Sequence, residues 1–473
     1  MTIEPVTKLI DDACKRYAER TAMFERGGNP ILFKNLFFIS ESFAGTLAER
    51  GVREGDFVAM DIGDAVSTIS LILSLLKIGA KIVPMSRYHE KDTKNAQFHW
   101  VLITEDRIKG DPREIVFRAD WLRPPKRPFP GRGKGIYVSS SSGTTGEPKQ
   151  YVSSETLLAS RVLSEIERRD APTGPIFNGF RPTTSVGLKC ILVAMYCGLP
   201  QLHKAESEEK TLRLMAELGV TDAYLPPISF KLLVDAAKTA PVIPKSMEKF
   251  RVGGGAISSE LAKEAEELFD CEVFSTFGSA ETGSISMYRI LDYAEYPGVV
   301  GPIGKNLNYR FTGEFGEDVD EETGGDLWIQ VPRDERRPGF APTPDPYDED
   351  GWVDTGDIGR ILPNGSLQLI GRKAEFINIG GNKFAPSVFE NKLRKLPYIG
   401  DVAAFRVAGT TGIDEVGLAV VPREDFDVDV LHAYLKNNFD FYIKFHIKRM
   451  DEIPYTEMGK VNRRSLTQSA ISQ

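Results

Sequence analysis

A stretch of glycine and hydroxyl-bearing residues that ends in a lysine has the composition of a phosphate-binding loop. It reads Ser142-Gly143-Thr144-Thr145-Gly146-Glu147-Pro148-Lys149 and follows an expected strand, Gly135–Ser140. Glycines let backbone N–H groups approach an anion, while the hydroxyls and the Lys149 ammonium add donors and positive charge. The stretch holds no G-x-x-x-x-G-K-[ST] pattern, so it is not a Walker A loop. A solvated Ser/Thr-rich turn is the alternative interpretation.

A carboxylate that could bind a divalent cation follows another expected strand. The segment Phe277-Gly278-Ser279-Ala280-Glu281 closes the strand Glu272–Phe277. Carboxylate oxygen is a hard ligand of the kind that Mg²⁺ prefers when the ion also bridges nucleotide phosphates. Without further context, the same residues would be a plain turn after a strand.

An acidic and a basic residue are brought together by a predicted hairpin. Asn364-Gly365 is a strong signal for a two-residue turn, here between Ile358–Leu362 and Ser366–Ile370. In that register Asp357 lies directly opposite Arg372, with Cβ atoms about 5 Å apart. The simplest role for the pair is a cross-strand ion pair that shapes the hairpin.

Two further segments could serve chemistry near the C-terminus. Gly380 and Gly381, within Ile377–Lys383, allow a close approach of the backbone to a ligand, although a turn before a helix beginning near Pro386 would explain them equally. Lys460 lies in the segment Pro454–Arg463 and could stabilise concentrated negative charge. A single lysine near a chain end is more often a solvated charge.

Taken in order, these motifs resemble those of the adenylate-forming (AMP-binding) enzyme superfamily, which includes acyl- and aryl-CoA synthetases, the adenylation domains of peptide synthetases and luciferases. The probability that a stretch of this length carries the phosphate-loop string by chance is on the order of 10⁻⁹ to 10⁻⁸. The resemblance implies an ATP- and Mg²⁺-dependent ligase. It would convert a carboxylic acid to an acyl-adenylate with release of pyrophosphate, and then transfer the acyl group to a thiol, with CoA as the favoured acceptor.

The resemblance also implies roles for individual residues. Lys460, Glu281 and Lys149 would be catalytic, and Glu281 and Thr145 would hold Mg²⁺. Asp357 and Arg372 would bind the ribose, and Gly380 and Gly381 would border the thiol channel. The remaining nucleotide-binding residues would be Ser142, Gly143, Thr144, Gly146, Gly254, Gly255, Phe277, Gly278, Ser279 and Ala280. The acid pocket would comprise Phe177, Phe180, Thr184, Ser185, Tyr224, Gly253 and Ala256.

The pocket composition favours an aryl or acyl acid. Aromatic and glycine residues suit a flat or apolar substrate with few polar contacts. Residues 171–221 contain no aspartate, the usual partner of the ammonium group in amino-acid-activating relatives. Gln150, Ala280 and Ala374 depart from the family pattern, as does the stretch before Gly187, which lacks an aromatic residue or histidine.

Alternation of strands and helices predicts the scaffold that positions these residues. Expected strands include Phe57–Ile62, Lys81–Met85 and Lys249–Gly253, and expected helices include Ala65–Leu76 and Ser259–Leu268. This pattern predicts an α/β fold, with a large N-terminal domain of stacked, mainly parallel sheets and helices and a small C-terminal α+β domain. We expect residues 1–372 to form the AMP-binding adenylation domain and residues 373–473 a mobile domain that carries Lys460. The charge-rich stretch Asp334–Asp350 is expected to be a solvated loop.

Composition and charge exclude several classes of protein. The chain has 473 residues and a formal net charge of −8, which argues against general binding to nucleic acid or an anionic membrane. The longest apolar run, Thr68–Leu76, is too short to span a bilayer. Four scattered cysteines and a charged N-terminal segment favour a cytoplasmic protein. The five histidines show no metal-binding spacing and are expected to be structural or exposed.

Two alternatives stay open at this point. The first is a stand-alone adenylation enzyme that loads a carrier protein or passes the adenylate to another nucleophile. The second is a nucleotide-binding regulatory protein with degraded catalysis, suggested by the departures at Gln150, Ala280 and Ala374. Release of AMP that depends on CoA, and release of pyrophosphate in the presence of an acid, would distinguish them.

Overall fold

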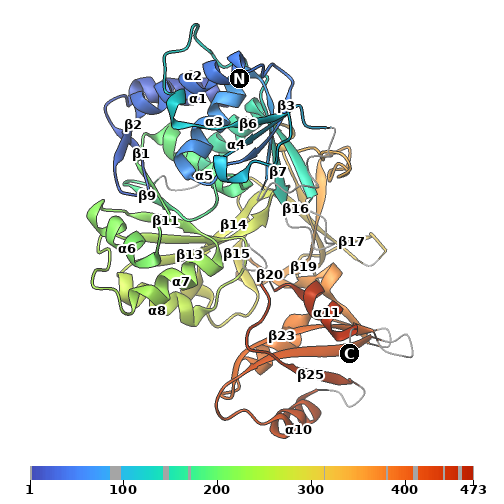
Figure 1. The fold of residues 1–473 in the computed structure, drawn as a ribbon. Helices are drawn as coiled ribbons and strands as arrows, with labels where there is room; N and C mark the ends of the chain where they lie inside the picture. The colour runs from blue at the N-terminus through green and yellow to red at the C-terminus, as the bar shows by residue number, and fades with distance from the viewer. Residues whose placement is uncertain are drawn as a thin grey trace.

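Two mainly parallel sheets form the larger part of the molecule (Figure 1). The computed structural model describes residues 3–85, 97–141, 149–168, 172–313, 315–379, 382–408, 414–439, 443–455 and 461–471. Within these residues the first sheet has the order β6-β5-β3-β4-β7-β8, in which β8 alone runs antiparallel to its neighbour. Its strands are β3 Phe57–Asp61, β4 Lys81–Pro84, β5 Trp100–Ile103, β6 Glu114–Val116, β7 Ile136–Ser141 and β8 Lys149–Ser154.

The second sheet has the order β14-β13-β12-β11-β9-β10-β1-β2 and is parallel from β13 to β1. Its strands are β1 Thr21–Phe24, β2 Pro30–Leu32, β9 Ile176–Asn178, β10 Gln201–His203, β11 Asp222–Leu225, β12 Lys249–Gly253, β13 Glu272–Ser279 and β14 Gly283–Arg289. Parallel strands need crossover helices, and those helices bury the faces of the sheet. The helices are α1 Val6–Arg16, α2 Phe33–Glu49, α3 Ala65–Ile78, α4 Glu155–Arg168, α5 Ser185–Cys197, α6 Glu208–Glu217, α7 Pro227–Ala237 and α8 Ser259–Phe269.

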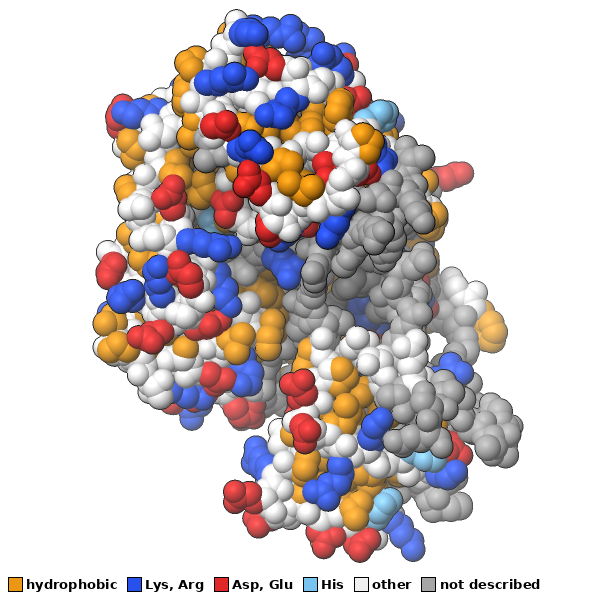
Figure 2. All heavy atoms as spheres, viewed as in Figure 1, with side chains coloured by type: hydrophobic (Ala, Val, Ile, Leu, Met, Phe, Trp, Pro, Cys, Tyr) orange, Lys and Arg blue, Asp and Glu red, His pale blue; other side chains and the backbone are white. Residues whose placement is uncertain are grey.

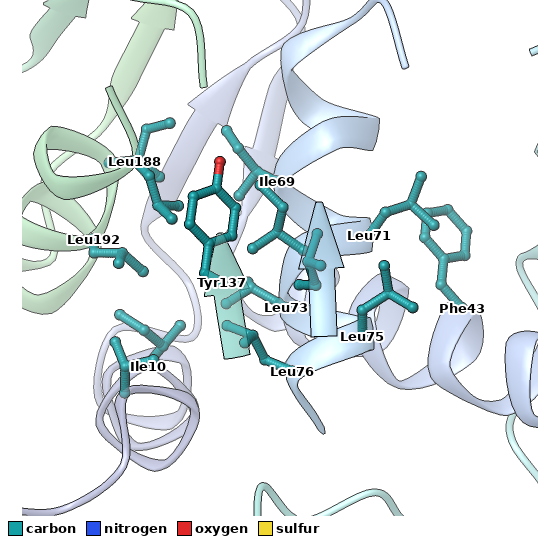
Figure 3. Close-up of a cluster of buried hydrophobic side chains, with 14 of the residues drawn as sticks. Ile10, Phe43, Ile69, Leu71, Leu73, Leu75, Leu76, Tyr137, Leu188 and Leu192 are labelled. Atoms are coloured by element: carbon teal, nitrogen blue, oxygen red, sulfur yellow. The ribbon is translucent and has the colours of Figure 1, made fainter. Parts of the chain in front are cut away.

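Helix α3 lies at the centre of the first hydrophobic core. Its side chains pack with Ile10 of α1, Phe43 of α2, Tyr137 of β7 and Leu188 of α5 (Figure 3). The apolar run that is too short for a membrane is therefore a buried helix. No helix in the described part of the chain is long and apolar enough to cross a membrane. On the face shown in Figure 2, acidic and basic side chains are intermixed.

An antiparallel sheet of order β15-β20-β19-β18-β16-β17 follows the two parallel sheets. Its strands are β15 Val299–Pro302, β16 Asn308–Thr312, β17 Asp318–Val319, β18 Gly325–Gln330, β19 Trp352–Ile361 and β20 Ser366–Arg372. The remaining elements are β21 Ile377–Ile379, β22 Asn382–Phe384, α9 Pro386–Leu393, β23 Ile399–Ala408, β24 Asp414–Pro422, α10 Val428–Asn438, β25 Phe445–Arg449 and α11 Arg463–Ile471. They have a hydrophobic core of their own, around Phe389 and Leu418, and lie at the lower end of Figure 1.

This arrangement confirms the expected α/β fold class, including the small α+β unit at the C-terminal end. Strands β8 and β25 and helix α11, which are short or follow loops, are not among the elements expected from the sequence. The boundary at residue 372 stays a prediction.

The hairpin between β19 and β20 corrects the expected turn. Its loop has three residues, because the Leu362 N–H donates to the Ser366 carbonyl and Gly365 adopts a left-handed φ of 79°. One extra residue, Ile370, then bulges from β20 between the pairs Ile358–Gly371 and Gly359–Leu369. The longer loop and the bulge compensate each other, so Asp357 lies opposite Arg372 as predicted.

A short 3-10 turn, η6 Lys373–Glu375, follows β20. The Lys373 ammonium forms ion pairs with Asp354, at 2.8 Å, and with Asp326, which lie on strands β19 and β18. Two residues later, Glu375 pairs at 2.8 Å with Arg463, the first residue of α11. The two ends of this turn are therefore held by different parts of the chain.

A buried ion-pair triad supports the first core and gives a stability test. The Lys77 side chain is 1% exposed, and its ammonium lies 2.8 Å from Asp11 and 2.7 Å from Glu41. Lys77→Ala leaves two carboxylates buried without their cation. We expect it to lower the free energy of unfolding by about 3–5 kcal/mol, measured by urea unfolding followed through tryptophan fluorescence. Lys15→Ala removes only an exposed pair and should change little; equal stability of the two variants would contradict the role of the triad.

Candidate functional site

The phosphate-loop residues connect two antiparallel strands. Ser141 at the end of β7 pairs with Lys149 at the start of β8, so the two ends of the loop are held side by side. The loop itself, residues 142–148, lies outside the described residues. Gln150 pairs with Ser140 in the same ladder, an extended conformation that does not require glycine. The departure from the family pattern at this position therefore leaves the strand intact.

Lys149 and Glu281 face one cavity of about 410 Å³, although they are far apart in the sequence. Tyr151, Trp328, Tyr347 and Asp354 also line this cavity. The Tyr151 hydroxyl donates to Glu281 Oε1 at 2.5 Å. Burial and the neighbouring Glu281 raise the pKa of Tyr151, so the phenol stays protonated and acts as the donor. Lys149 and Tyr151 lie two residues apart on β8, and this spacing places both on the same side of the strand.

The backbone that carries Glu281 is held from two other elements. Arg161 of α4 donates through Nη1 to the Ala280 carbonyl and through Nη2 to the Glu281 carbonyl, both at 2.9 Å. The Tyr347 hydroxyl donates to the Glu281 carbonyl at 2.8 Å. The predicted Gly278 is also required by the structure, because a Cβ there would lie 2.0 Å from the Gly283 carbonyl oxygen. These contacts hold the backbone from which the Glu281 side chain extends.

The stretch Asp334–Asp350 corrects the expectation of a solvated loop. Its backbone pairs with β8, because the Val152 N–H donates to the Pro338 carbonyl and the Phe340 N–H to the Gln150 carbonyl. Arg337 is 2% exposed and donates from Nη1 to the Ser185 hydroxyl, and burial together with Arg161 lowers its pKa. The loop thus covers the strand that follows the phosphate loop. The aromatic residues Phe340 and Tyr347 were the available signal for this packing.

Asp357 and Arg372 form the predicted ion pair, with 2.9 Å between Arg372 Nε and Asp357 Oδ1. Asp357 is buried, and its backbone N–H donates to the Thr355 hydroxyl at 3.1 Å. Neither residue lines the cavity that Lys149 and Glu281 share, whereas Asp354 of the same strand does. The structure therefore brings these predicted residues together as two separate pairs, Lys149 with Glu281 and Asp357 with Arg372.

The predicted acid-pocket residues lie at the carboxyl ends of parallel strands, where α/β proteins bind ligands. Tyr224 and Gly253 lie near the ends of β11 and β12, and Gly254, Gly255 and Ala256 follow β12. Thr184 caps α5 by accepting from the Gly187 N–H at 3.1 Å. Phe180 and Thr184 line a second cavity, of about 670 Å³. Phe177, in contrast, packs in the second hydrophobic core with Leu202 and Leu225.

Several predicted residues lie outside the described residues, so the structure does not place them: Ser142, Gly143, Thr144, Thr145, Gly146, Gly380, Gly381 and Lys460. The end of the Lys460 motif is described. Arg463 donates to Glu375, to Glu390 and to the Ala404 carbonyl, and so ties α11 to the C-terminal sheet.

The donor set around Glu281 fits a magnesium ion that is held mainly by a nucleotide. The described residues contain no group of three or more histidine, cysteine, aspartate or glutamate side chains that could hold a metal ion alone. Mg²⁺ at nucleotide sites uses one or two carboxylates together with substrate phosphates. Glu281 can supply such a carboxylate, with one oxygen already oriented by Tyr151.

Comparisons with known proteins identify the family and match the fold. The model of the family described as AMP-binding enzyme matches residues 10–333, and the chain belongs to this family. A probable CoA ligase, CCL9, from Humulus lupulus is 23% identical over 99% of this chain and 97% of that protein. Naringenin synthase from Pestalotiopsis fici is 25% identical over 92% of this chain, which spans 18% of that protein. The fold matches ATP-bound MatB from Rhodopseudomonas palustris with a TM-score of 0.84, at 21% identity over 98% of both chains.

The contact between Tyr151 and Glu281 gives a test of the candidate metal site. Tyr151→Phe keeps the ring but removes the hydrogen bond that orients the carboxylate. We expect about tenfold weaker Mg²⁺-dependent binding of ATP, since partners of metal ligands contribute to this extent. Titration calorimetry with ATP at several Mg²⁺ concentrations would measure the change. Tyr296→Phe, at an exposed tyrosine, is the matched control, and identical Mg²⁺ dependence in the two variants would contradict the assignment.

Proposed function

We propose that this protein uses ATP to activate a carboxylic acid, with an aryl or acyl acid favoured, and then transfers the acyl group to a thiol, with CoA as the favoured acceptor. The observation that carries the proposal is the shared cavity of Lys149 and Glu281. A cation next to a carboxylate, adjoining the ends of the strands that hold the predicted acid pocket, suits a triphosphate that must meet a carboxylic acid. The name of the Humulus lupulus relative supports CoA as the acceptor.

In the first step a carboxylate oxygen of the acid attacks the α-phosphorus of ATP. An oxygen–phosphorus bond forms, the bond between the α- and β-phosphates breaks, and pyrophosphate leaves. Lys149, with the backbone and hydroxyls of Thr144 and Thr145, would bind the phosphates, and Asp357 and Arg372 would bind the ribose. Mg²⁺, held by Glu281 and Thr145, would neutralise part of the charge on the phosphates.

In the second step the thiol sulfur attacks the acyl carbon of the adenylate. A thioester bond forms and AMP leaves with the electrons of the broken acyl–oxygen bond. Gly380 and Gly381 would allow the thiol to approach past the backbone. The C-terminal unit would expose Lys460 to the site in the first step and the two glycines in the second.

The proposed reaction is tested by measuring pyrophosphate and AMP. Wild-type protein with ATP and Mg²⁺ should release pyrophosphate when an aryl or acyl acid is present, and AMP release should rise on addition of CoA. A panel of aryl, short-chain, long-chain and amino acids, each with and without CoA, identifies the acid class. Pyrophosphate without CoA-stimulated AMP release would favour the alternative acceptors, and tight ATP binding with no pyrophosphate from any acid would favour the regulatory alternative.

Lys460→Ala tests whether this lysine acts in adenylate formation and not in thioester formation. Loss of one donor to the transition state should slow adenylate formation by on the order of 10²–10³. Thioester formation from supplied acyl-adenylate and CoA should be spared, because Lys460 would have left the site by then. Single-turnover measurements of each step separate the two effects. Equal losses in both steps would contradict the proposal that the C-terminal unit presents Lys460 in the first step only.

A further inference from the structure

The buried guanidinium of Arg337 has no carboxylate partner in the described part of the chain. Its Nε atom is buried without a hydrogen-bond partner, and its Nη1 atom donates to the Ser185 hydroxyl. Buried charges in native proteins are normally paired, because an isolated charge loses its hydration without compensation. The position of this cation therefore calls for an explanation.

The groups that face Arg337 do not supply a compensating charge at short range. Burial raises the pKa of Tyr137 and of Tyr347, so both phenols are uncharged near pH 7. Burial and the neighbouring cation Arg161 lower the pKa of Arg337. Glu281 attracts Arg337, but the two side chains form no ion pair in the described part of the chain. The surroundings of Arg337 therefore carry an excess of positive charge.

The backbone of Arg337 is held from both sides. Its N–H donates to the Tyr347 hydroxyl at 2.9 Å, and this hydroxyl donates in turn to the Glu281 carbonyl at 2.8 Å. The carbonyl of the next residue, Pro338, accepts from the Val152 N–H of β8 at 2.9 Å. Because the side chain is also buried, both packing and the backbone keep the guanidinium beside Ser185.

Ser185 connects Arg337 with the predicted acid pocket. It is the first residue of α5, a helix of 13 residues, and it is half-buried. A serine hydroxyl has one proton to donate and two lone pairs that accept. One lone pair accepts from Arg337, whereas no described residue accepts the Ser185 proton. This proton is therefore available to a ligand that reaches the N-terminal end of α5.

The surroundings of the Ser185 hydroxyl favour an anion as that ligand. A hydroxyl that accepts from a cation becomes a stronger donor, because successive hydrogen bonds polarise one another. The first turn of a helix carries partial positive charge, and Thr184 stabilises this turn by accepting from the Gly187 N–H. Arg337 adds a full positive charge behind the hydroxyl. A carboxylate at this position would gain from all three contributions.

The location of Arg337 indicates which end of the acid would bind there. Arg337 contacts the predicted acid pocket through Ser185, and its charge interacts with that of Glu281 at the candidate metal site. The reacting carboxylate is the part of the acid that must approach the metal-bound phosphates. Between the acid pocket and Glu281 we therefore expect the reacting carboxylate and not the remote end of the acid.

We propose that the Ser185 hydroxyl donates a hydrogen bond to the reacting carboxylate of the acid, and that Arg337 is the positioning residue that directs this hydroxyl. The proposal rests on the proposed function, because it assumes a carboxylic acid as the substrate. Ser185 binds the substrate directly, and Arg337 acts through Ser185. The resemblance to the family implies Ser185 as a pocket residue, whereas Arg337 lies in the stretch Asp334–Asp350, for which a solvated loop is expected.

Kinetics with Ser185→Ala, Arg337→Met and the double variant test the proposal. Pyrophosphate release is measured with the acid that the wild-type protein uses best, while the concentrations of acid and ATP are varied separately. Loss of a charge-assisted donor should raise KM for the acid about tenfold in each single variant. KM for ATP should change much less. Calorimetric binding of the acid gives the same comparison without turnover.

Two further variants distinguish a positioning role from an independent one. The double variant should bind the acid no more weakly than the weaker single variant, because both changes remove the same interaction. Arg337→Lys keeps the positive charge and should recover part of the lost affinity. Arg333→Met, at an exposed arginine of the same segment, is the matched control and should leave KM for the acid unchanged.

Thermal melting separates a role in binding from a role in folding. Methionine fills much of the space of the arginine stem and carries no charge, so Arg337→Met removes an uncompensated buried cation. The melting temperature of this variant without ligands should be equal to that of the wild-type protein or higher.

Four outcomes would contradict these ideas. Absence of pyrophosphate release by the wild-type protein with every acid would overturn the proposed function itself. Release by the wild-type protein, with an unchanged KM for the acid in Ser185→Ala or Arg337→Met, would overturn only this inference. Additive effects of the two changes would overturn the positioning role, because Arg337 would then act independently of Ser185. A lower melting temperature of Arg337→Met with an unchanged KM for the acid would assign the residue to fold stability and would also overturn the inference.

Discussion

The guanidinium of Arg161 is the contact on which the candidate site depends. It donates to the carbonyl oxygens of Ala280, Glu281 and Glu335, and thereby joins α4, the turn after β13 and the segment after β18. Helix α4 begins directly after β8, the strand that carries Lys149 and Tyr151. One buried cation thus holds together the segments that supply the cation and the carboxylate of the site. Hydrogen bonds from charged groups contribute more than neutral ones, which suits this role.

The same contact shapes the electrostatics around Glu281. Arg161 and Arg337 are both buried nearby, and their proximity contributes to lowering the pKa of Arg337. Two basic side chains thus lie close to Glu281, while Lys149 shares the cavity with three carboxylates, those of Glu281, Asp348 and Asp354. The loop Asp334–Asp350 therefore contributes charged groups to the surroundings of Glu281, although its composition is that of an exposed segment.

Local patterns predicted many of the strands and helices and the ion pair at the hairpin, because each depends on residues close in the sequence. The pair of Asp357 and Arg372 was predicted although the expected turn was wrong, since the bulge at Ile370 restored the register. Tyr151, Arg161 and Tyr347 were missed because their roles come from contacts across more than sixty residues, such as that between Tyr347 and Glu281. A tyrosine or arginine in an ordinary strand, helix or loop carries no local sign of such a partner.

The ion pairs on either side of η6 connect this short turn to two different parts of the chain. Lys373 is anchored to strands β18 and β19, and Glu375 is anchored to Arg463 in the C-terminal unit. A change in the orientation of the C-terminal unit that keeps both ion pairs would have to be absorbed by the torsion angles of residues 373–375 and by the flexible side chains that form the pairs. Because ion pairs at partly exposed positions weaken with salt, high ionic strength would loosen both ends of this turn.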